Sequence, residues 1–187
     1  MLHSPRLTAI LDANVLYPAP LRDYLLNLAA VDLYKPKWTD TIQDEWIRNL
    51  LLNRPDIKRQ DLERTRKAMD GAFPDANVTN YKTLIGNLYL PDPDDRHVLA
   101  AAIEANAEII ITSNLKDFPG DSLKPYDITV QHPDEFIEDL INLDKTSALE
   151  ALNNQIKRLR NPPMSMDDVL LTLEKCGLTK SVANLRN

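Results

Sequence analysis

Hydrophobic residues along the chain fall into short apolar runs and into longer stretches with helical spacing. Residues 7–11 are almost wholly apolar and are followed directly by Asp12. Such a run is typical of a strand that is buried on both faces of a parallel sheet. Residues 108–112 have the same character, residues 127–130 predict a third strand, and residues 31–34 predict another short one.

Between these strands, apolar residues recur every three or four positions, which is the spacing of helices. Ile42, Trp46 and Leu50 mark one such helix, which begins near Thr39. The other helices are expected at residues 20–30, 56–70, about 95–106 and 133–142. Because parallel neighbours need a crossover, strands that alternate with helices predict an α/β fold with a mostly parallel sheet.

Beyond residue 143 the chain shows helical patterns alone. Helices are predicted at residues 146–160, 165–175 and 179–186, with a break at Pro162 and Pro163. We therefore divide the chain into an α/β domain, residues 1–144, and a helical extension, residues 145–187. The extension is too short for a large core of its own, so we expect it to pack on the main domain.

The composition, 43% hydrophobic and 27% charged, is that of a soluble globular protein. No apolar run approaches the roughly 20 residues of a membrane helix, and no signal peptide is evident, so we expect a cytoplasmic protein without a membrane partner. A single cysteine, Cys176, excludes an internal disulfide and a multi-cysteine zinc site. Glycine-rich phosphate loops and serine-nucleophile motifs are also missing from the sequence.

The net charge of −6 is unevenly distributed. Residues 145–187 carry a net +3 and the remainder carries −9, which fits a metal site near an extension that contacts a polyanion. Because phosphate contacts come mainly from Lys and Arg, the basic residues of two segments are candidates for RNA contacts. They are Lys58, Arg59, Arg64, Arg66, Lys67, Lys157, Arg158 and Arg160, although such charges are usually just a solvated face.

Acidic residues are placed where an α/β sheet collects its ligands. Asp12 directly follows the first strand, and Asp117 lies five residues after the run 108–112. Asp95 begins the helix that leads into that run, and Glu45 lies inside an earlier helix. Side chains just past the carboxyl ends of parallel strands converge on one crevice, so we expect these acids to lie together.

A cluster of carboxylates is costly without a cation, because like charges raise each other's pKa. Mg²⁺ and Mn²⁺ prefer oxygen ligands, and a metal-bound water can attack a phosphodiester. We expect Asp12 to be the central metal ligand, with Asp95 and Asp117 completing the set. Glu45 would either bind the metal or orient the attacking water.

Neighbouring polar residues are expected to support these ligands by hydrogen bonds. The candidates are Asn14, Asp94, Thr112, Ser113 and Asn114. Some of the polar residues near the site have a plainer interpretation. Asp94 is the expected N-cap of the Asp95 helix, and Asn14 and the candidate ligand Asp117 suit turns. Likewise, a helical Glu such as Glu45 is most often solvated, and His97 is expected to be a surface or packing residue rather than a base.

Taken together, the segments ILDANVLYP, DEW and DPDDRHVLAAAIEANAEIIITSNLKDFP resemble the PIN-domain nucleases, particularly the VapC-type toxins of bacterial toxin–antitoxin modules. The resemblance covers about residues 7–142. It implies a three-layer α/β/α domain and Mg²⁺- or Mn²⁺-dependent endoribonuclease activity. It also implies frequent homodimers and inhibition by a cognate, DNA-binding antitoxin.

The resemblance matches the family's catalytic acids to Asp12, Glu45 and Asp95. Many relatives carry a fourth Asp where this chain has Asn114, so Asn114 and Asp117 compete for the last position. The extension resembles the C-terminal part of a subset of longer PIN proteins. We therefore expect a metal-dependent toxin ribonuclease. The alternative is a noncatalytic PIN-like module that binds RNA or a protein partner, whereas a phosphatase would need a second Asp at Asn14.

Overall fold

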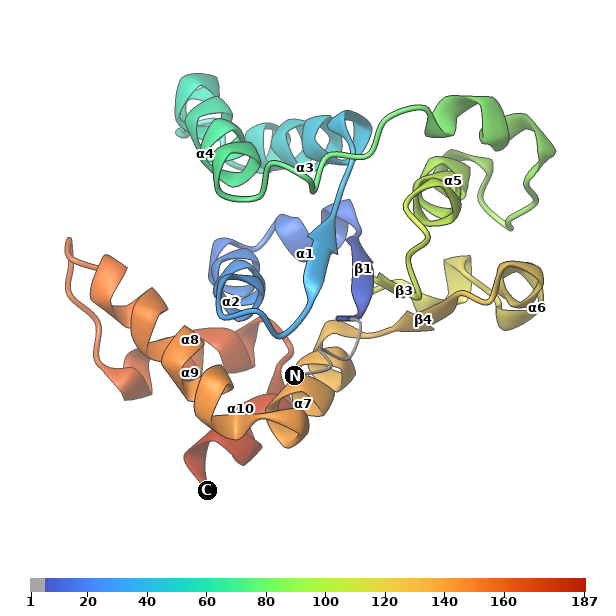
Figure 1. The fold of residues 1–187 in the computed structure, drawn as a ribbon. Coiled ribbons are helices and arrows are strands. Elements are labelled where there is room, and N and C mark those ends of the chain that lie inside the picture. Colours follow the sequence, from blue (N-terminus) through green and yellow to red (C-terminus); the bar gives the residue numbers. More distant parts are fainter. Residues whose placement is uncertain (1–5) are drawn as a thin grey trace.

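The centre of the molecule is a parallel sheet that the apolar runs of the sequence form. In the computed structural model, which describes residues 6–187, the strand order is β2-β1-β3-β4 (Figure 1). The strands are β1 (Thr8–Leu11), β2 (Lys35–Lys37), β3 (Ile109–Ile111) and β4 (Thr129–Gln131). His3 lies outside the described residues.

Strand β1 is central, and it pairs with β2 on one side and with β3 on the other. Its residues Ala9, Ile10 and Leu11 are fully buried, as the apolar run predicts. Because Ile10 lies opposite Ile110 and Leu11 opposite Ile111, the two strands end side by side. The residues that follow β1 and β3 therefore lie next to each other at the carboxyl ends of the two inner strands.

The second strand lies four residues later than the sequence predicts. Residues 31–34 were expected to form it, but Asp32 adopts a positive φ of 68° and Leu33 donates its N–H back to Leu28. The strand forms instead at Lys35–Lys37, which is polar and contains Pro36. This is tolerated because β2 is an edge strand, where one side of the backbone needs no partner.

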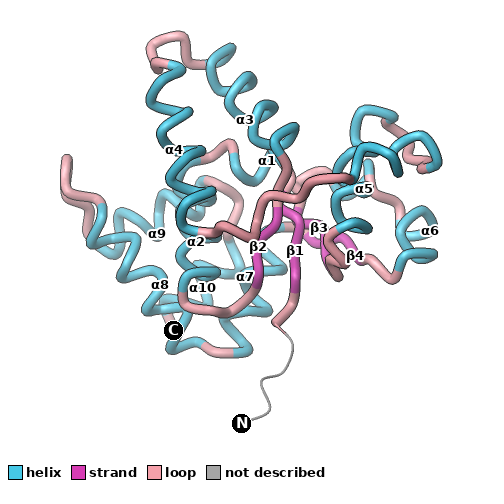
Figure 2. Tube along the Cα trace, turned by 45° about the horizontal axis from the view of Figure 1, so that its top comes forward, coloured by secondary structure: helices cyan, strands magenta, loops and turns pink. Residues whose placement is uncertain are grey.

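Helices cover both faces of the sheet. The helix α5 (Arg96–Glu104) lies on one side, and α2 (Ala19–Ala30) and α7 (Pro133–Leu143) lie on the other (Figure 2). Residues Val98 to Ala102 of α5 are fully buried against the strands. The expected three-layer α/β/α architecture is thus confirmed.

Two longer helices, α3 (Asp40–Asn53) and α4 (Arg59–Ala72), form a pair after β2. Short elements that the sequence pattern did not reveal are α1 (Ala13–Leu16), α6 (Gly120–Leu123) and 3₁₀ turns including Tyr81–Asn87. One helical turn shows no repeat of apolar positions, so periodicity cannot find it. Within residues 6–187, no helix combines the length and the apolar character needed to cross a membrane.

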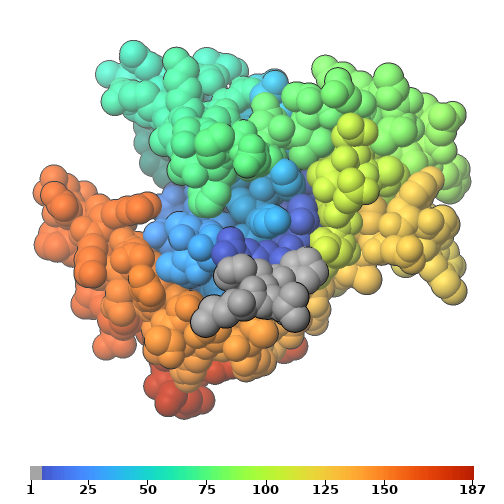
Figure 3. Space-filling model, in the orientation of Figure 1, coloured from blue at the N-terminus to red at the C-terminus, as the bar shows by residue number. Residues whose placement is uncertain are grey.

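The C-terminal helices pack on the α2 and α7 layer, as expected. They are α8 (Lys145–Arg158), α9 (Met166–Lys175) and α10 (Thr179–Arg186), and Figure 3 shows this segment in orange and red against the blue N-terminal part. Ala148, Ala151 and Leu152 of α8 are fully buried. The Tyr24 hydroxyl donates to the Ala148 carbonyl at 3.2 Å, so the layers also share a buried hydrogen bond.

Candidate active site

Asp12 occupies the junction between β1 and α1, and neutral donors fix its carboxylate. Oδ1 accepts from the Ala13 N–H at 2.7 Å. Oδ2 accepts from Asn14 Nδ2 at 2.9 Å and from the Thr112 hydroxyl at 2.8 Å. Asp12 is 6% exposed, so its orientation is set by these three hydrogen bonds rather than by solvent.

The same polar residues connect the ends of β1 and β3. Asn14 Nδ2 also donates to Thr112 Oγ1 at 2.8 Å, and Asn14 Oδ1 accepts from the Ser113 N–H at 2.9 Å. The Asn114 N–H donates to Thr112 Oγ1 at 3.1 Å. Asn14 and Thr112 therefore act through their side chains, whereas Ser113 and Asn114 contribute their main-chain N–H groups.

Asp95 immediately precedes α5, but its side chain does not cap the helix. Its side chain makes no hydrogen bond to the first turn within the described residues. The expected cap, Asp94, does not serve either: the Asp92 carboxylate accepts from the Asp94 N–H at 2.8 Å and caps the preceding 3₁₀ turn. Asp94 does not cap α5 because it lies inside the 3₁₀ turn Pro93–Asp95, which comes before the helix. The Asp95 carboxylate is thus available for another role.

The acids lie close enough for their charges to act on Asp95 and Asp12. Partial burial, followed by the negative charges of Asp12, Asp92 and Asp117, raises the pKa of Asp95 to about 6. Burial raises the pKa of Asp12, and the charge of Glu45 adds to this, although hydrogen bonds from Thr112 and Ala13 oppose it. The four predicted acids therefore share one electrostatic environment.

Glu45 approaches the site from α3, and it contacts His97, for which the sequence predicted a surface or packing role. Glu45 Oε1 lies 3.0 Å from Nε2 of His97, which is in the first turn of α5. His97 is 8% exposed, so it is a buried residue rather than a surface one. Its position two residues after Asp95 is the one sequence signal that could have drawn attention to it.

Asp117 and Asn114 occupy different environments. Asp117 is half-buried in the 3₁₀ turn Leu115–Asp117, and its charge acts on Asp95. Asn114 is exposed, and its recorded hydrogen bonds involve its main chain: its N–H donates to Thr112 and its carbonyl accepts from Asp117. Asp117 is therefore the one of the two whose charge acts on the acid cluster, and its role as the fourth ligand stays a prediction.

The donor set suits a hard divalent cation. It consists of carboxylate oxygens, which Mg²⁺ and Mn²⁺ prefer as ligands. The mutual repulsion of the acids disfavours their ionised, negatively charged forms, and a bound cation would favour those forms again. Within residues 6–187, no three His, Cys, Asp or Glu side chains form a ready-made ligand group. Such a group is not required, since Mg²⁺ usually binds through one or two carboxylates, waters and substrate phosphates. The residues therefore fit the ion.

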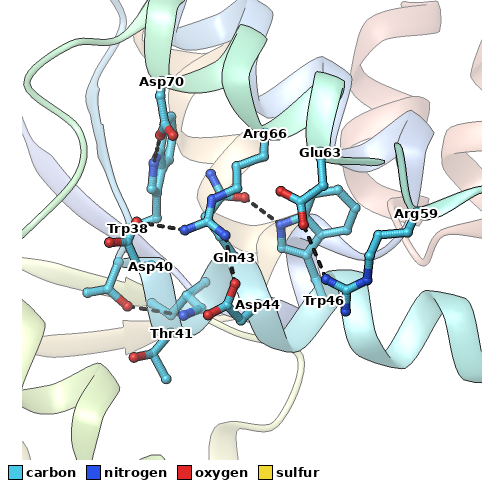
Figure 4. A network of polar contacts seen from close by, with 12 residues as sticks. Trp38, Asp40, Thr41, Gln43, Asp44, Trp46, Arg59, Glu63, Arg66 and Asp70 are labelled. Atoms are coloured by element: carbon cyan, nitrogen blue, oxygen red, sulfur yellow. Dashed lines mark hydrogen bonds and ion pairs between the residues drawn. The ribbon is translucent and has the colours of Figure 1, made fainter. Parts of the chain in front are cut away.

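Several of the basic residues proposed for RNA contacts have acidic partners. Figure 4 shows Arg66 between Asp40 and Asp44, at 2.8 and 2.6 Å, and Arg59 beside Glu63. Arg64 pairs with Asp61 in the same way. The candidates that are exposed and form no ion pair within the described residues are Lys58, Lys67, Lys157, Arg158 and Arg160. Arg158 also lines a groove of about 760 Å³ along β2, to which none of the four acids contributes.

Comparison with known proteins gives two family matches. Residues 8–116 match the PIN domain, and residues 133–187 match the VapC50 C-terminal domain, which here begins with α7. A region of 76 residues is 42% identical to "Putative ribonuclease VapC50" of Mycobacterium tuberculosis (strain ATCC 25618 / H37Rv). That region covers 41% of this chain and 45% of the relative, so the chain matches less than half of the relative's length.

No solved structure matches the chain significantly. The PIN-domain match, in contrast, includes β1, β2 and β3 and three of the four acids, Asp12, Glu45 and Asp95, and it ends one residue before Asp117. Because this match extends over more than half of the sequence, the chain belongs to the PIN-domain family.

Proposed function

We propose that this protein is an Mg²⁺- or Mn²⁺-dependent endoribonuclease. The observation that carries the proposal is the acid cluster at the carboxyl ends of the strands, where the pKa of Asp95 rises to about 6 beside Asp12 and Asp117. Four acids drawn from separate segments of the chain create a site that a divalent cation would stabilise. The name of the relative from Mycobacterium tuberculosis, "Putative ribonuclease VapC50", supports RNA as the substrate.

Each acid has a role that follows from its surroundings. A carboxylate offers about four acceptor positions. Asp12 uses three of them in hydrogen bonds, so one position on Oδ1 remains for a cation. Asp95 and Asp117 complete the ligand set, and Glu45 either joins it or orients the attacking water. When bound, the cation lowers the pKa of water and stabilises the charge that develops on the phosphate.

The first experiment is RNA cleavage by the purified protein in Mn²⁺ and in EDTA. We expect Asp12→Asn and Asp95→Asn each to reduce Mn²⁺-dependent cleavage at least about 100-fold, because each removes a ligand charge. Asp94→Asn is the matched control, since Asp94 is exposed and adjacent to Asp95. Cleavage that both variants retain would contradict the proposal. A wild-type protein that binds RNA without cutting it would favour the noncatalytic alternative.

The biological role that we propose is that of the toxin in a type II toxin–antitoxin pair, acting in the cytoplasm. The match of residues 133–187 to the VapC50 C-terminal domain supports it. The partners would be RNA and a DNA-binding antitoxin, and the toxin itself could form homodimers. Expression should arrest growth, and Asp12→Asn or coexpression of the neighbouring antitoxin gene should restore it. Unimpaired growth with the wild-type protein would contradict the toxin role.

A further inference from the structure

The contact between His97 and Glu45 joins α5 to α3 at the acid cluster. Nε2 of His97 lies 3.0 Å from Oε1 of Glu45, and the two side chains are 10% and 25% exposed. An N···O contact of this length between two largely buried side chains restricts the positions of both. The pair therefore links the first turn of one helix to the interior of another.

His97 has no other polar partner in the part of the chain that the structure describes. Its second ring nitrogen, Nδ1, is buried and forms no hydrogen bond there. Burying an unpaired polar atom is unfavourable, so a buried His that serves packing alone is a poor choice over an apolar residue. Glu45 is therefore the polar contact that the buried ring makes within the described residues.

Glu45 depends on the same contact. Within residues 6–187 its carboxylate has no recorded hydrogen bond or ion pair other than the one to His97. A Glu side chain in mid-helix can adopt several rotamers, and each unfixed torsion would disperse the carboxylate over several positions. His97 is therefore the group that selects one position for Glu45.

We propose that His97 is a positioning residue, whose Nε2–H holds the Glu45 carboxylate in the orientation that the acid site needs. This inference rests on the proposed nuclease function and deepens it. The charge of Glu45 acts on Asp12, so the held carboxylate lies within electrostatic reach of the central acid of the cluster. His97 acts through Glu45 and needs no contact with RNA.

The test compares His97→Leu with His97→Gln. Leu keeps apolar volume but removes the donor, whereas Gln carries an N–H donor at a similar distance from the backbone. We expect His97→Leu to lower kcat about 10- to 100-fold and to change KM less than about 3-fold. The reason is that Glu45 loses the residue that holds its carboxylate in place, whereas RNA binding loses no contact. His97→Gln should recover most of the loss. If the Leu variant does not fold, His97→Asn, whose donor is too short to reach Glu45, replaces it.

A double-mutant cycle with Glu45→Gln separates positioning from general stabilisation. If His97 acts through Glu45, the Glu45→Gln variant has already lost what His97 contributes to cleavage. Adding His97→Leu to that variant should then lower kcat by less than about a further 3-fold. Losses that multiply in the double variant would overturn the inference. So would a His97→Leu variant that cleaves RNA at the wild-type rate.

A measurement that needs no cleavage activity distinguishes this inference from the proposed function. The hydrogen-bonded ring N–H of His97 should give a slowly exchanging proton resonance in the NMR spectrum of the wild-type protein. Glu45→Ala should shift it or abolish it. A resonance that is absent in the wild type, or insensitive to Glu45→Ala, overturns the inference. A wild-type protein without cleavage in Mn²⁺ overturns the proposed function instead.

Discussion

Individual side chains around Asp12 determine how the site is ordered. Thr112 is fully buried, donates to Asp12 Oδ2 and accepts from Asn14 and from the Asn114 N–H. It therefore connects the residues that follow β1 with those that follow β3. If this buried hydroxyl were removed, its three hydrogen bonds to Asp12, Asn14 and Asn114 would be lost together.

Thr112→Val should remove this connection while it keeps the shape of the side chain. We expect a loss of about 1–3 kcal/mol in the free energy of unfolding, because buried donors and an acceptor lose their partner. We also expect cleavage to fall about 10- to 100-fold. Urea denaturation and initial rates measure the two effects. Thr129→Val on β4, an exposed position, is the control, and equal effects of the two variants would contradict this role.

Asp95 should make the metal-free protein less stable as the pH rises. Its pKa in the folded state is about 6, against an ordinary value of 3.8, so the folded state binds more protons than the unfolded state between these values. Stability is therefore highest below about pH 4 for this group and is lost as the pH rises through 6. In EDTA, Asp95→Asn should raise Tm at pH 7 but not at pH 4. A Tm lowered at pH 7 would contradict the account.

Among the secondary-structure elements, α10 depends on a residue from α7. Its own N-terminus has no side-chain cap. The buried carboxylate of Asp134 accepts instead from the Lys180 N–H at 3.0 Å and from the Ser181 N–H at 2.9 Å. It also accepts from the Ser181 hydroxyl at 2.7 Å. Asp134 thus both caps α10 and attaches it to the α/β layers.

Asp134→Ala should destabilise the protein by about 3 kcal/mol, because buried donors lose a charged acceptor at a helix N-terminus. The free energy of urea unfolding measures the change. Asp139→Ala on the same helix is the control, since the Asp139 hydrogen bond to Gln131 is exposed. We expect that control to cost less than about 1 kcal/mol. Equal costs would mean that the cap contributes little.

The elements differ in how far the sequence could predict them. The strands that precede Asp12 and Thr112 were predicted because both are buried runs of apolar residues. The strand β2 was misplaced because Lys35–Lys37 has no apolar pattern and gains its order by pairing with β1. The inward direction of Glu45 was predicted mainly from the family resemblance, because a Glu inside a helix is most often solvated. Its contact with His97 depends on how α3 and α5 pack, which no local pattern records.

Across the whole molecule, the C-terminal helices complete the core. The helix α8 buries Ala148, Ala151 and Leu152 completely, and Gln155 donates to the Pro20 carbonyl at 3.0 Å. We therefore propose that residues 145–187 are an extension that the α/β domain, residues 1–144, needs in order to fold. The alternative is that residues 145–187 form an independent unit, whose removal would leave the α/β domain folded.

A chain that ends at Leu143 should therefore aggregate or lose cooperative unfolding, because the apolar surface beneath α8 would be exposed to water. Size-exclusion chromatography and thermal unfolding by circular dichroism measure this. Coexpression of residues 144–187 as a separate chain is the control, and it should restore a soluble complex. A shortened chain that is monomeric and unfolds cooperatively would show that the extension is dispensable.

The central proposal is that a divalent cation binds between Asp12, Asp95 and Asp117 and draws together carboxylates that, among the described residues, form no ready-made ligand group without it. Its most direct test is Mn²⁺ binding by isothermal titration calorimetry to the wild-type protein, Asp12→Asn, Asp95→Asn, Asp117→Asn and Asn114→Ala. We predict that each Asp variant weakens Mn²⁺ binding at least about 10-fold, whereas Asn114→Ala leaves it unchanged. Wild-type affinity in Asp12→Asn and Asp95→Asn would contradict the claim.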